Sequence, residues 1–231
     1  MELTDGTLLG GRVHYRQPAT GYRTGIEPIL LAASIPAKPG DRVLEAGCGA
    51  GAGLLCLLAR LPGVHGTGVE RDPAMADLAR HNAAANTMAL DIVTGTIEAL
   101  TVPTPFDHAF ANPPWHDAAS TPSPTKAWAK RAEGDVLTRW WAALARSVRH
   151  RGTVTLLIPA AQFGRGAAAA RAARLGGLTL MPLWPRAGVA AKLVLIRATV
   201  GSRAADRIEP GLMLHDGAGF TAAAEQMLRW S

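Results

Sequence analysis

The stretch Val43–Gly53, VLEAGCGAGAG, joins a short apolar run to a turn in which glycine occupies every second position. The apolar run predicts a strand, and the segment after the glycines predicts a helix. The glycines Gly47, Gly49, Gly51 and Gly53 allow positive φ angles and a close approach of the backbone to a ligand. Their G-x-G-x-G spacing differs from the strict G-x-G-x-x-G fingerprint of dinucleotide sites. The stretch therefore predicts a ligand-binding turn at the carboxyl end of a strand.

Strand-like and helix-like segments alternate on both sides of this turn. Strands are expected at 41–47, 65–70, 90–95, 106–111, 152–159, 178–184 and 192–199. Helices are expected at 52–61, 73–86, 135–149 and 164–177. The alternation predicts an α/β fold with a mostly parallel, seven-stranded sheet and helices on both faces. The last two strands are separated only by a short loop, which predicts an antiparallel hairpin at one edge. Trp140 and Trp141 are expected to pack in the core.

The chain length favours one domain, 1–231, with a catalytic core at 41–231. Residues 1–40 do not follow the alternation. We expect them to form a cap over the carboxyl end of the sheet, where open α/β sheets bind their ligands.

Charge is distributed unevenly along the chain. The net charge is +6, and the segment from Lys126 to Arg207 holds 15 basic and 3 acidic residues, against 9 and 15 elsewhere. This favours a polyanionic partner such as nucleic acid, although an arginine-rich proteome would give the same composition. No apolar run is long enough to span a membrane, and the start lacks a signal-peptide pattern. Cys48 and Cys56 lack metal-ligand spacing, so we expect no metal and two reduced thiols in a cytoplasmic protein.

Two acids frame the glycine turn. Glu45 lies two positions before its first glycine, where the charge of Glu45 would repel a pyrophosphate and favour a cationic or zwitterionic ligand. Glu70 ends the second expected strand. A carboxylate there can accept both hydrogens of a ribose cis-diol.

With these acids and this strand spacing, residues 43–115 resemble the class I S-adenosylmethionine-dependent methyltransferases. The resemblance implies a Rossmann-like fold and S-adenosylmethionine as cofactor. It also implies that the glycine loop wraps the methionine part and that Glu70, followed by Arg71, holds the ribose. Many members carry an acid after the third strand to bond the adenine amino group. Thr96 stands there in this chain, and Ile97 is expected to pack on the adenine ring.

The four residues after the fourth expected strand, Asn112, Pro113, Pro114 and Trp115, form the motif NPPW. It is similar to the (Asn/Asp/Ser)-Pro-Pro-aromatic motif of amino methyltransferases. The resemblance implies that the Asn112 side-chain oxygen and the Pro113 carbonyl accept the two hydrogens of the reacting amine. The prolines fix the backbone, and Trp115 offers a face on which a flipped base can stack.

The segment Gln17–Ser34, QPATGYRTGIEPILLAAS, together with NPPW resembles the bacterial tRNA(Val) adenine-N6 methyltransferases. This implies a tRNA substrate methylated on the adenine next to the anticodon. It also implies that Arg23 and Gly25 lie near the cofactor carboxylate. We expect RNA contacts from four basic residues, Lys126, Lys130, Arg131 and Arg186.

Other functions share much of this pattern. A protein glutamine-N5 methyltransferase uses the same NPP-aromatic geometry, but such enzymes usually carry an N-terminal helical domain for their protein partner. An N6-adenine methyltransferase of rRNA or DNA remains open, because the pocket binds a base and not the whole nucleic acid. A non-catalytic cofactor-binding or RNA-binding module is a further alternative, although Asn112 and the glycines are intact. The oligomeric state is not predicted.

Overall fold

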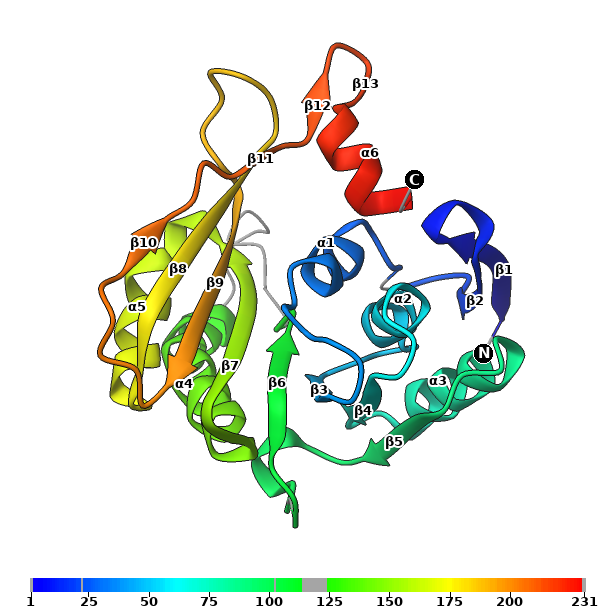
Figure 1. Ribbon diagram of the computed structural model, residues 1–231, viewed down its shortest axis with the longest axis horizontal. Helices are drawn as coiled ribbons and strands as arrows, with labels where there is room; N and C mark the ends of the chain where they lie inside the picture. Colours follow the sequence, from blue (N-terminus) through cyan, green and yellow to red (C-terminus); the bar gives the residue numbers. More distant parts are fainter. Residues whose placement is uncertain (1, 22, 102, 114–123, 230–231) are drawn as a thin grey trace.

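A sheet of nine described strands forms the centre of the computed structural model (Figure 1). The structure describes residues 2–21, 23–101, 103–113 and 124–229, and for 124–135 it describes the backbone only. The sheet order is β10-β8-β9-β7-β6-β3-β4-β5, with β11 paired to β8. The strands are β3 (Arg42–Ala46), β4 (His65–Glu70), β5 (Leu90–Thr94), β6 (Phe106–Ala111), β7 (Val148–Pro159), β8 (Leu175–Trp184), β9 (Leu193–Val200), β10 (Arg207–Ile208) and β11 (Leu212–Met213). The predicted Rossmann-like, mostly parallel sheet is confirmed.

The predicted antiparallel hairpin consists of β8 and β9, and its two strands do not follow one another along the sheet in chain order. β3 to β7 pair in parallel, whereas β9 is antiparallel to both β7 and β8. β9 lies between β7 and β8, and the two-residue strands β10 and β11 extend the sheet beyond β8. The predicted antiparallel hairpin is therefore present, but its second strand fills the gap that the β7-to-β8 crossover leaves. A helix that connects two parallel strands commonly leaves such a gap.

Helices cover both faces of the sheet (Figure 1). They are α1 (Glu27–Ala33), α2 (Ala52–Arg60), α3 (Pro73–Ala85), α4 (Pro124–Ser147), α5 (Phe163–Ala172) and α6 (Ala222–Arg229). Short 3-10 turns occur at η1 (Leu9–Gly11), η2 (Ile97–Ala99) and η3 (Ala160–Gln162). Neighbouring strand residues alternate between two cores: Val43 and Leu157 pack with α1 and α2, and Leu44 and Ile158 pack with α4 and α5. This period-2 alternation explains why the strands are apolar on both faces.

The N-terminal segment begins with an antiparallel hairpin of β1 (Leu3–Leu8) and β2 (Val13–Pro18). Two asparagines of α3 attach β2 to the rest of the fold. Asn82 accepts from Arg16 N and donates to Arg16 O, both at 2.9 Å. Asn86 makes the same pair of bonds to His14, at 2.8 and 2.7 Å. Side chains four apart on a helix lie on one face, so together they replace the backbone of a neighbouring strand.

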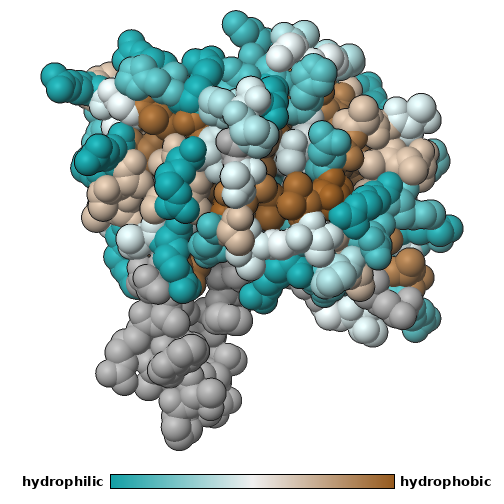
Figure 2. Space-filling model, turned by 90° about the horizontal axis from the view of Figure 1, so that it is seen from below, coloured by the Kyte–Doolittle hydropathy of each residue, from teal (hydrophilic) through white to brown (hydrophobic). Residues whose placement is uncertain are grey.

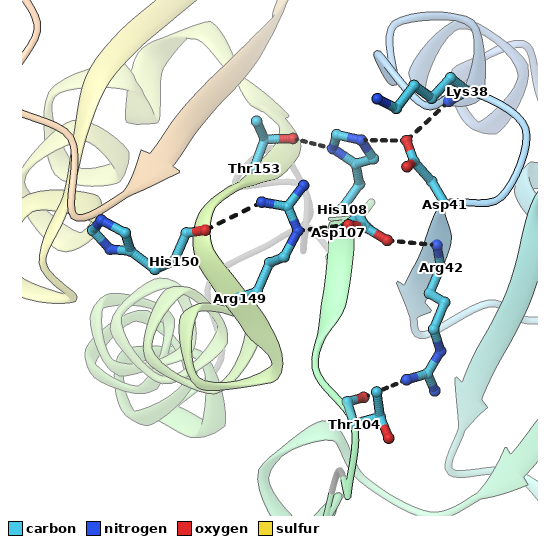
Figure 3. Close-up of polar contacts among 9 residues, drawn as sticks. All are labelled: Lys38, Asp41, Arg42, Thr104, Asp107, His108, Arg149, His150 and Thr153. Carbon is cyan, nitrogen blue, oxygen red and sulfur yellow. Dashed lines mark hydrogen bonds and ion pairs between the residues drawn. The ribbon is translucent and has the colours of Figure 1, made fainter.

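A polar network joins the amino ends of β3, β6 and β7 (Figure 3). His108 on β6 lies with Nε2 3.2 Å from Asp41 Oδ2 and with Nδ1 2.8 Å from Thr153 Oγ1. Beside it, Asp107 accepts a hydrogen bond from Arg149 Nε at 2.6 Å. Asp41 and His108 are both buried, at 8% exposure each. These contacts lie at the end of the sheet opposite to the glycine turn, and they hold three neighbouring strands together.

We expect the network to make stability depend on pH. Burial lowers the pKa of His108, against the opposing effect of Asp41, so the folded protein keeps this imidazole neutral. The unfolded chain binds the proton more readily, and stability therefore falls as pH drops below about 6.5, the ordinary histidine pKa. Urea unfolding of the wild type and of His108→Gln at several pH values checks this. The variant is expected to lose less stability on acidification. An equal loss in both proteins would contradict the role of His108, and His65→Gln, at an exposed position, serves as control.

Among the described residues, few large apolar side chains are exposed. Seen from below the view of Figure 1, the surface is mostly hydrophilic, with apolar residues gathered in a band across the centre (Figure 2). Within the described residues, no helix combines the length and the apolar character that crossing a membrane requires. Cys48 and Cys56 are free and buried, and burial raises the pKa of the Cys56 thiol to about 12.

Candidate functional site

The parallel register aligns the carboxyl ends of four strands. Ala46 of β3 lies opposite Val69 of β4 and Ala111 of β6, so Gly47 and Asn112 leave neighbouring strands at the same level. A cleft of about 860 Å³ opens at this edge. The predicted site residues among those that line it are Glu45, Gly47, Gly49, Glu70, Arg71, Thr96, Ile97, Asn112 and Pro113. The structure thus brings together most of the predicted site residues that it describes.

The glycine turn passes close to the opposite wall of the cleft. Gly47 has a φ of 67°, which a residue with a side chain rarely adopts. A β-carbon built on Gly47 would lie only 3.0 Å from Trp140 Cη2 of α4. Gly51, at φ 89°, forms the N-cap of α2, as its place at the end of the turn predicts. Both the positive φ of Gly47 and its short distance to Trp140 therefore favour glycine at this position.

Glu45 lies at the base of the cleft. Its side chain is buried at 4% exposure, and its Oε2 accepts a hydrogen bond of 3.0 Å from Leu54 N on the first turn of α2. Burial raises the pKa of Glu45 to about 8; the bond from Leu54 opposes this shift and the charge of Glu70 adds to it. A buried carboxyl of this kind favours a cation beside it, because a positive charge stabilises the ionised form.

Glu70 is oriented by two backbone donors. Its Oε2 accepts from Gly49 N and its Oε1 from Asp72 N, both at 2.9 Å. The first bond links the carboxylate directly to the glycine turn. Each carboxylate oxygen retains a lone pair, so the group can still accept two hydroxyl hydrogens from a bound diol. The side chain is nearly buried, at 9% exposure.

The turn after β5 contributes three neighbouring residues to the cleft. Ile97 is buried at 4% exposure, whereas Thr96 and Glu98 are exposed. All three line the cleft. Glu98 was missed in the sequence analysis, which took Thr96 as the replacement for the usual acid. The signal was present, since Glu98 follows Thr96 by two positions, and the 3-10 turn at 97–99 brings it to the same wall.

The N-terminal segment forms a side wall of the cleft through Gln17, which begins the segment quoted in the sequence analysis, and through two residues that were not singled out there. Tyr15, Gln17 and Thr24 all line it. The Tyr15 hydroxyl and Thr24 Oγ1 are 2.7 Å apart, and Thr24 N donates to Gln17 Oε1 at 2.9 Å. These bonds fold the segment after β2 back onto the hairpin. That residues 1–40 cap a cofactor site stays a prediction.

Arg23 and Gly25 are not among the residues that line the cleft. The Arg23 guanidinium donates to the carbonyls of Pro18 and Ala19, at 3.5 and 3.3 Å. It therefore stabilises its own turn in this structure.

Helix α4 forms the wall opposite the glycine turn. Val136, Arg139 and Trp140 line the cleft, whereas Trp141 is fully buried in the core behind it. The expectation that both tryptophans pack in the core is confirmed for Trp141, whereas Trp140 is half-buried, packs against the same core and also lines the cleft. Neighbouring helix residues point about 100° apart, so one faces the core and the other the cleft.

Several predicted substrate residues cannot be assigned to this wall. Pro114 and Trp115 lie outside the described residues, and so do the side chains of Lys126, Lys130 and Arg131. Arg186 is described: it is exposed in the loop between β8 and β9 and donates to Gly217 O at 2.8 Å. It does not line the cleft.

Known proteins that are similar to this chain are methyltransferases. Residues 43–132 match the family model described as a methyltransferase domain. The chain is 29% identical over 211 residues to a tRNA1(Val) (adenine(37)-N6)-methyltransferase of Aeromonas hydrophila. The aligned region covers 89% of this chain and 88% of the relative. The matched domain and this relative support an S-adenosylmethionine-dependent methyltransferase.

Solved structures share the fold of this chain. A predicted O-methyltransferase of Agrobacterium tumefaciens has a TM-score of 0.71 at 24% identity, covering 87% of this chain and 94% of that one. The Thermus thermophilus 16S rRNA N2 G1207 methyltransferase, solved with AdoMet and guanosine, has a TM-score of 0.61 at 20% identity. The match covers 86% of this chain and 50% of the rRNA enzyme.

Cofactor affinity is expected to rise with pH through Glu45. Below a pKa of about 8 the carboxyl is mostly protonated, and a cationic cofactor favours its ionised form. The dissociation constant of S-adenosylmethionine should therefore fall as pH rises from about 6 to about 8, by up to about tenfold per unit. Calorimetric titration of the wild type and of Glu45→Gln checks this, because titration of the ligand's own amino group cancels between the two. Parallel pH profiles would show that Glu45 does not ionise on binding.

Proposed function

We propose that this methyltransferase transfers a methyl group from S-adenosylmethionine to the N6 amino group of an adenine in tRNA, next to the anticodon. The observation that carries the proposal is that Asn112 and Pro113 line the same cleft as the glycine turn. They leave β6 directly beside the point where Gly47 leaves β3. Further support comes from the Aeromonas hydrophila relative, whose name specifies adenine-N6 methylation of tRNA1(Val).

The proposed cofactor position follows the chemistry of the cleft walls. The glycine turn and Glu45 hold the methionine part, whose ammonium and sulfonium groups are cationic. Glu70 accepts the ribose hydroxyls, since both of its oxygens are already oriented by backbone donors. The adenine ring lies against Ile97, with Thr96 and Glu98 as acceptors for its amino group. Arg71, which also lines the cleft, borders the ribose.

The proposed reaction needs two acceptors at the amine. The lone pair of an adenine amino group is delocalised into the ring, which makes it a poor nucleophile. The Asn112 side-chain oxygen and the Pro113 carbonyl accept its two hydrogens and favour a pyramidal nitrogen. The nitrogen forms a bond to the methyl carbon, and the carbon–sulfur bond breaks with its electrons going to sulfur. The nitrogen then loses one proton to solvent. Because the sulfonium is a strong methyl donor, rate comes mainly from orientation.

The proposal for the nucleic-acid substrate rests on the resemblance and on charge. Trp115 would stack on the flipped base, and Lys126, Lys130 and Arg131 would contact phosphates in the following segment. The described part of the cleft adds Arg139 on the same helix. A stacking ring beside phosphate-binding side chains is the usual arrangement for an unstacked base in RNA.

A methyl-transfer assay tests the proposal. The methyltransferase is incubated with labelled S-adenosylmethionine and, separately, with unmodified tRNA or with a protein extract freed of nucleic acid. Label in tRNA that digests to N6-methyladenosine is the expected result. Label in protein alone would contradict the proposal and favour the glutamine amide, which presents the same NH2 geometry to Asn112 and Pro113. Unmodified rRNA and DNA in parallel test the other adenine substrates.

Substrate binding is expected to weaken steeply with salt. Contacts from about three basic side chains to phosphates predict a loss of about tenfold or more in affinity between about 50 and 200 mM salt. Fluorescence anisotropy with labelled tRNA measures this loss. The variant Lys126→Gln should bind more weakly at low salt and show a shallower slope. A flat response in the wild type would argue against phosphate contacts. The control is Lys192→Gln, at the exposed position directly before β9.

A further inference from the structure

A second cavity lies on the sheet face that carries α1 and α6. Its volume is about 390 Å³, and it shares no lining residue with the cofactor cleft. Its walls come from the end of α1, from β7, β8 and β9, from the segment around Pro210 and from α6. Figure 1 shows α1 and α6 on one side of these strands, with α4 and α5 behind them. The methyl-transfer chemistry proposed above makes no use of this cavity.

A row of polar residues crosses the floor of this cavity. Arg197 of β9 pairs directly with Thr155 of β7 on one side and with Thr179 of β8 on the other. Side chains directly opposite one another on neighbouring strands lie on the same face at contact distance. The next residues of the same face, Leu157 and Leu195, belong to the apolar core. Packing of the apolar core does not explain a Thr–Arg–Thr row in this layer.

The internal contacts of this row leave much of its hydrogen-bonding capacity unused. Arg197 donates from Nη1 to Ser34 O at 3.2 Å, which satisfies a carbonyl at the end of α1. Among the described residues no carboxylate forms an ion pair with Arg197. A guanidinium has five donors, so one bond to a carbonyl does not account for the side chain. The hydroxyl of Thr155, whose residue is only 1% exposed, is buried and has no described partner.

The remaining walls restrict the chemistry of a ligand. Met181, Leu195 and Met227 are apolar and suit a hydrocarbon side chain. Glu209 also lines the cavity, and its backbone N–H donates to Leu180 O at 2.8 Å, which places it beside the residue that follows Thr179. A carboxylate suits the guanidinium and hydroxyl donors. A second negative charge, as on phosphate, would meet Glu209, whereas an ammonium group would be attracted to it.

We infer that this second cavity binds a small α-amino acid with an apolar side chain. Its carboxylate lies against Arg197 and the two threonine hydroxyls, its ammonium group lies toward Glu209, and its side chain packs on the two methionines. The Thr155 hydroxyl thereby gains the partner that it lacks within the protein.

Calorimetric titration of the full chain tests this inference with four probes of related shape. L-leucine has all three groups, 4-methylpentanoate lacks the ammonium, isoamylamine lacks the carboxylate, and inorganic phosphate lacks the apolar body. We expect L-leucine to bind at millimolar concentration or better, 4-methylpentanoate to bind more weakly and isoamylamine not to bind. Absence of leucine binding at about 20 mM, or binding of phosphate in its place, would overturn the inference, since a Kd in the millimolar range corresponds to a weak specific site.

Variants separate binding from folding. Arg197→Gln is expected to weaken leucine binding about tenfold or more, because a charge-assisted bond is lost. Thr155→Val is expected to weaken it about threefold without lowering the melting temperature, since the hydroxyl has no partner to lose in the protein alone. Arg203→Gln, at an exposed position, is the control, and S-adenosylmethionine binding verifies the fold of each variant. Unchanged leucine affinity in both Arg197→Gln and Thr155→Val would also overturn the inference.

Discussion

The variant Asn112→Ala is expected to bind S-adenosylmethionine as the wild type does and to lose turnover about 100-fold or more. Asn112 lines the cleft at the end of β6, beside the point where Gly47 leaves β3. Its proposed part is to accept one hydrogen of the reacting amine. The Pro113 carbonyl remains in the variant, so one of two acceptors is lost while the cofactor walls are unchanged. Single-turnover methylation of tRNA and calorimetric titration of the cofactor measure the two quantities separately.

A control and an opposite outcome make this test decisive. Gln162→Ala removes an amide side chain from η3, which does not line the cleft, and should keep full turnover. Near-normal turnover of Asn112→Ala would exclude the proposed amine-holding mechanism. A parallel loss of cofactor affinity and turnover would instead assign Asn112 to the cofactor site alone.

The variant Glu70→Ala is expected to weaken S-adenosylmethionine binding about 100-fold or more, because each bond to a charged acceptor contributes about 1.5–3 kcal/mol. The substitution removes the proposed ribose acceptor. It also leaves Gly49 N and Asp72 N without the carboxylate that they bind at 2.9 Å. The glycine turn thereby loses a contact that holds it in place. Equilibrium titration with the cofactor measures the loss.

Two further variants distinguish the ribose contact from the support of the turn. Glu70→Gln keeps one acceptor oxygen and is expected to weaken binding less, by about tenfold. Asp91→Ala removes an exposed carboxylate from the neighbouring strand β5 and should leave affinity unchanged. An unaltered affinity in Glu70→Ala would contradict both the ribose contact and the role in the turn. A lowered melting temperature with normal affinity would leave only the structural role.

The fold and much of the cleft follow from patterns that are local in the sequence. The alternation of apolar strands and helices predicts the parallel sheet, because each pattern reflects which faces of one element are buried. The glycines, Glu45, Glu70 and Asn112 come directly at strand ends. Parallel strands end at one edge, so their neighbourhood could be predicted without knowing the strand order.

Other features of the site depend on contacts between distant segments. Trp140 lines the cleft because α4 packs beside the glycine turn, a contact between distant segments that its own sequence does not reveal. Glu98 lines the cleft because of a 3-10 turn. Asn82 and Asn86 bind backbone groups of β2, which are the same in every residue, so the sequence of β2 does not reveal this contact. A periodicity along the chain reports that a residue is buried and not what it is buried against.

The sequence by itself determined the fold class, the glycine turn and the position of the motif that we propose to bind the amine. Only the tertiary structure decided that burial raises the pKa of Glu45 to about 8, since that shift depends on what surrounds the carboxyl. It also decided that β9 enters between β7 and β8 and so aligns Thr155, Arg197 and Thr179 in one row. The physical reason is that cross-strand neighbours and local dielectric arise from packing between segments far apart in the chain, whereas strands, turns and helix starts arise from neighbours along it.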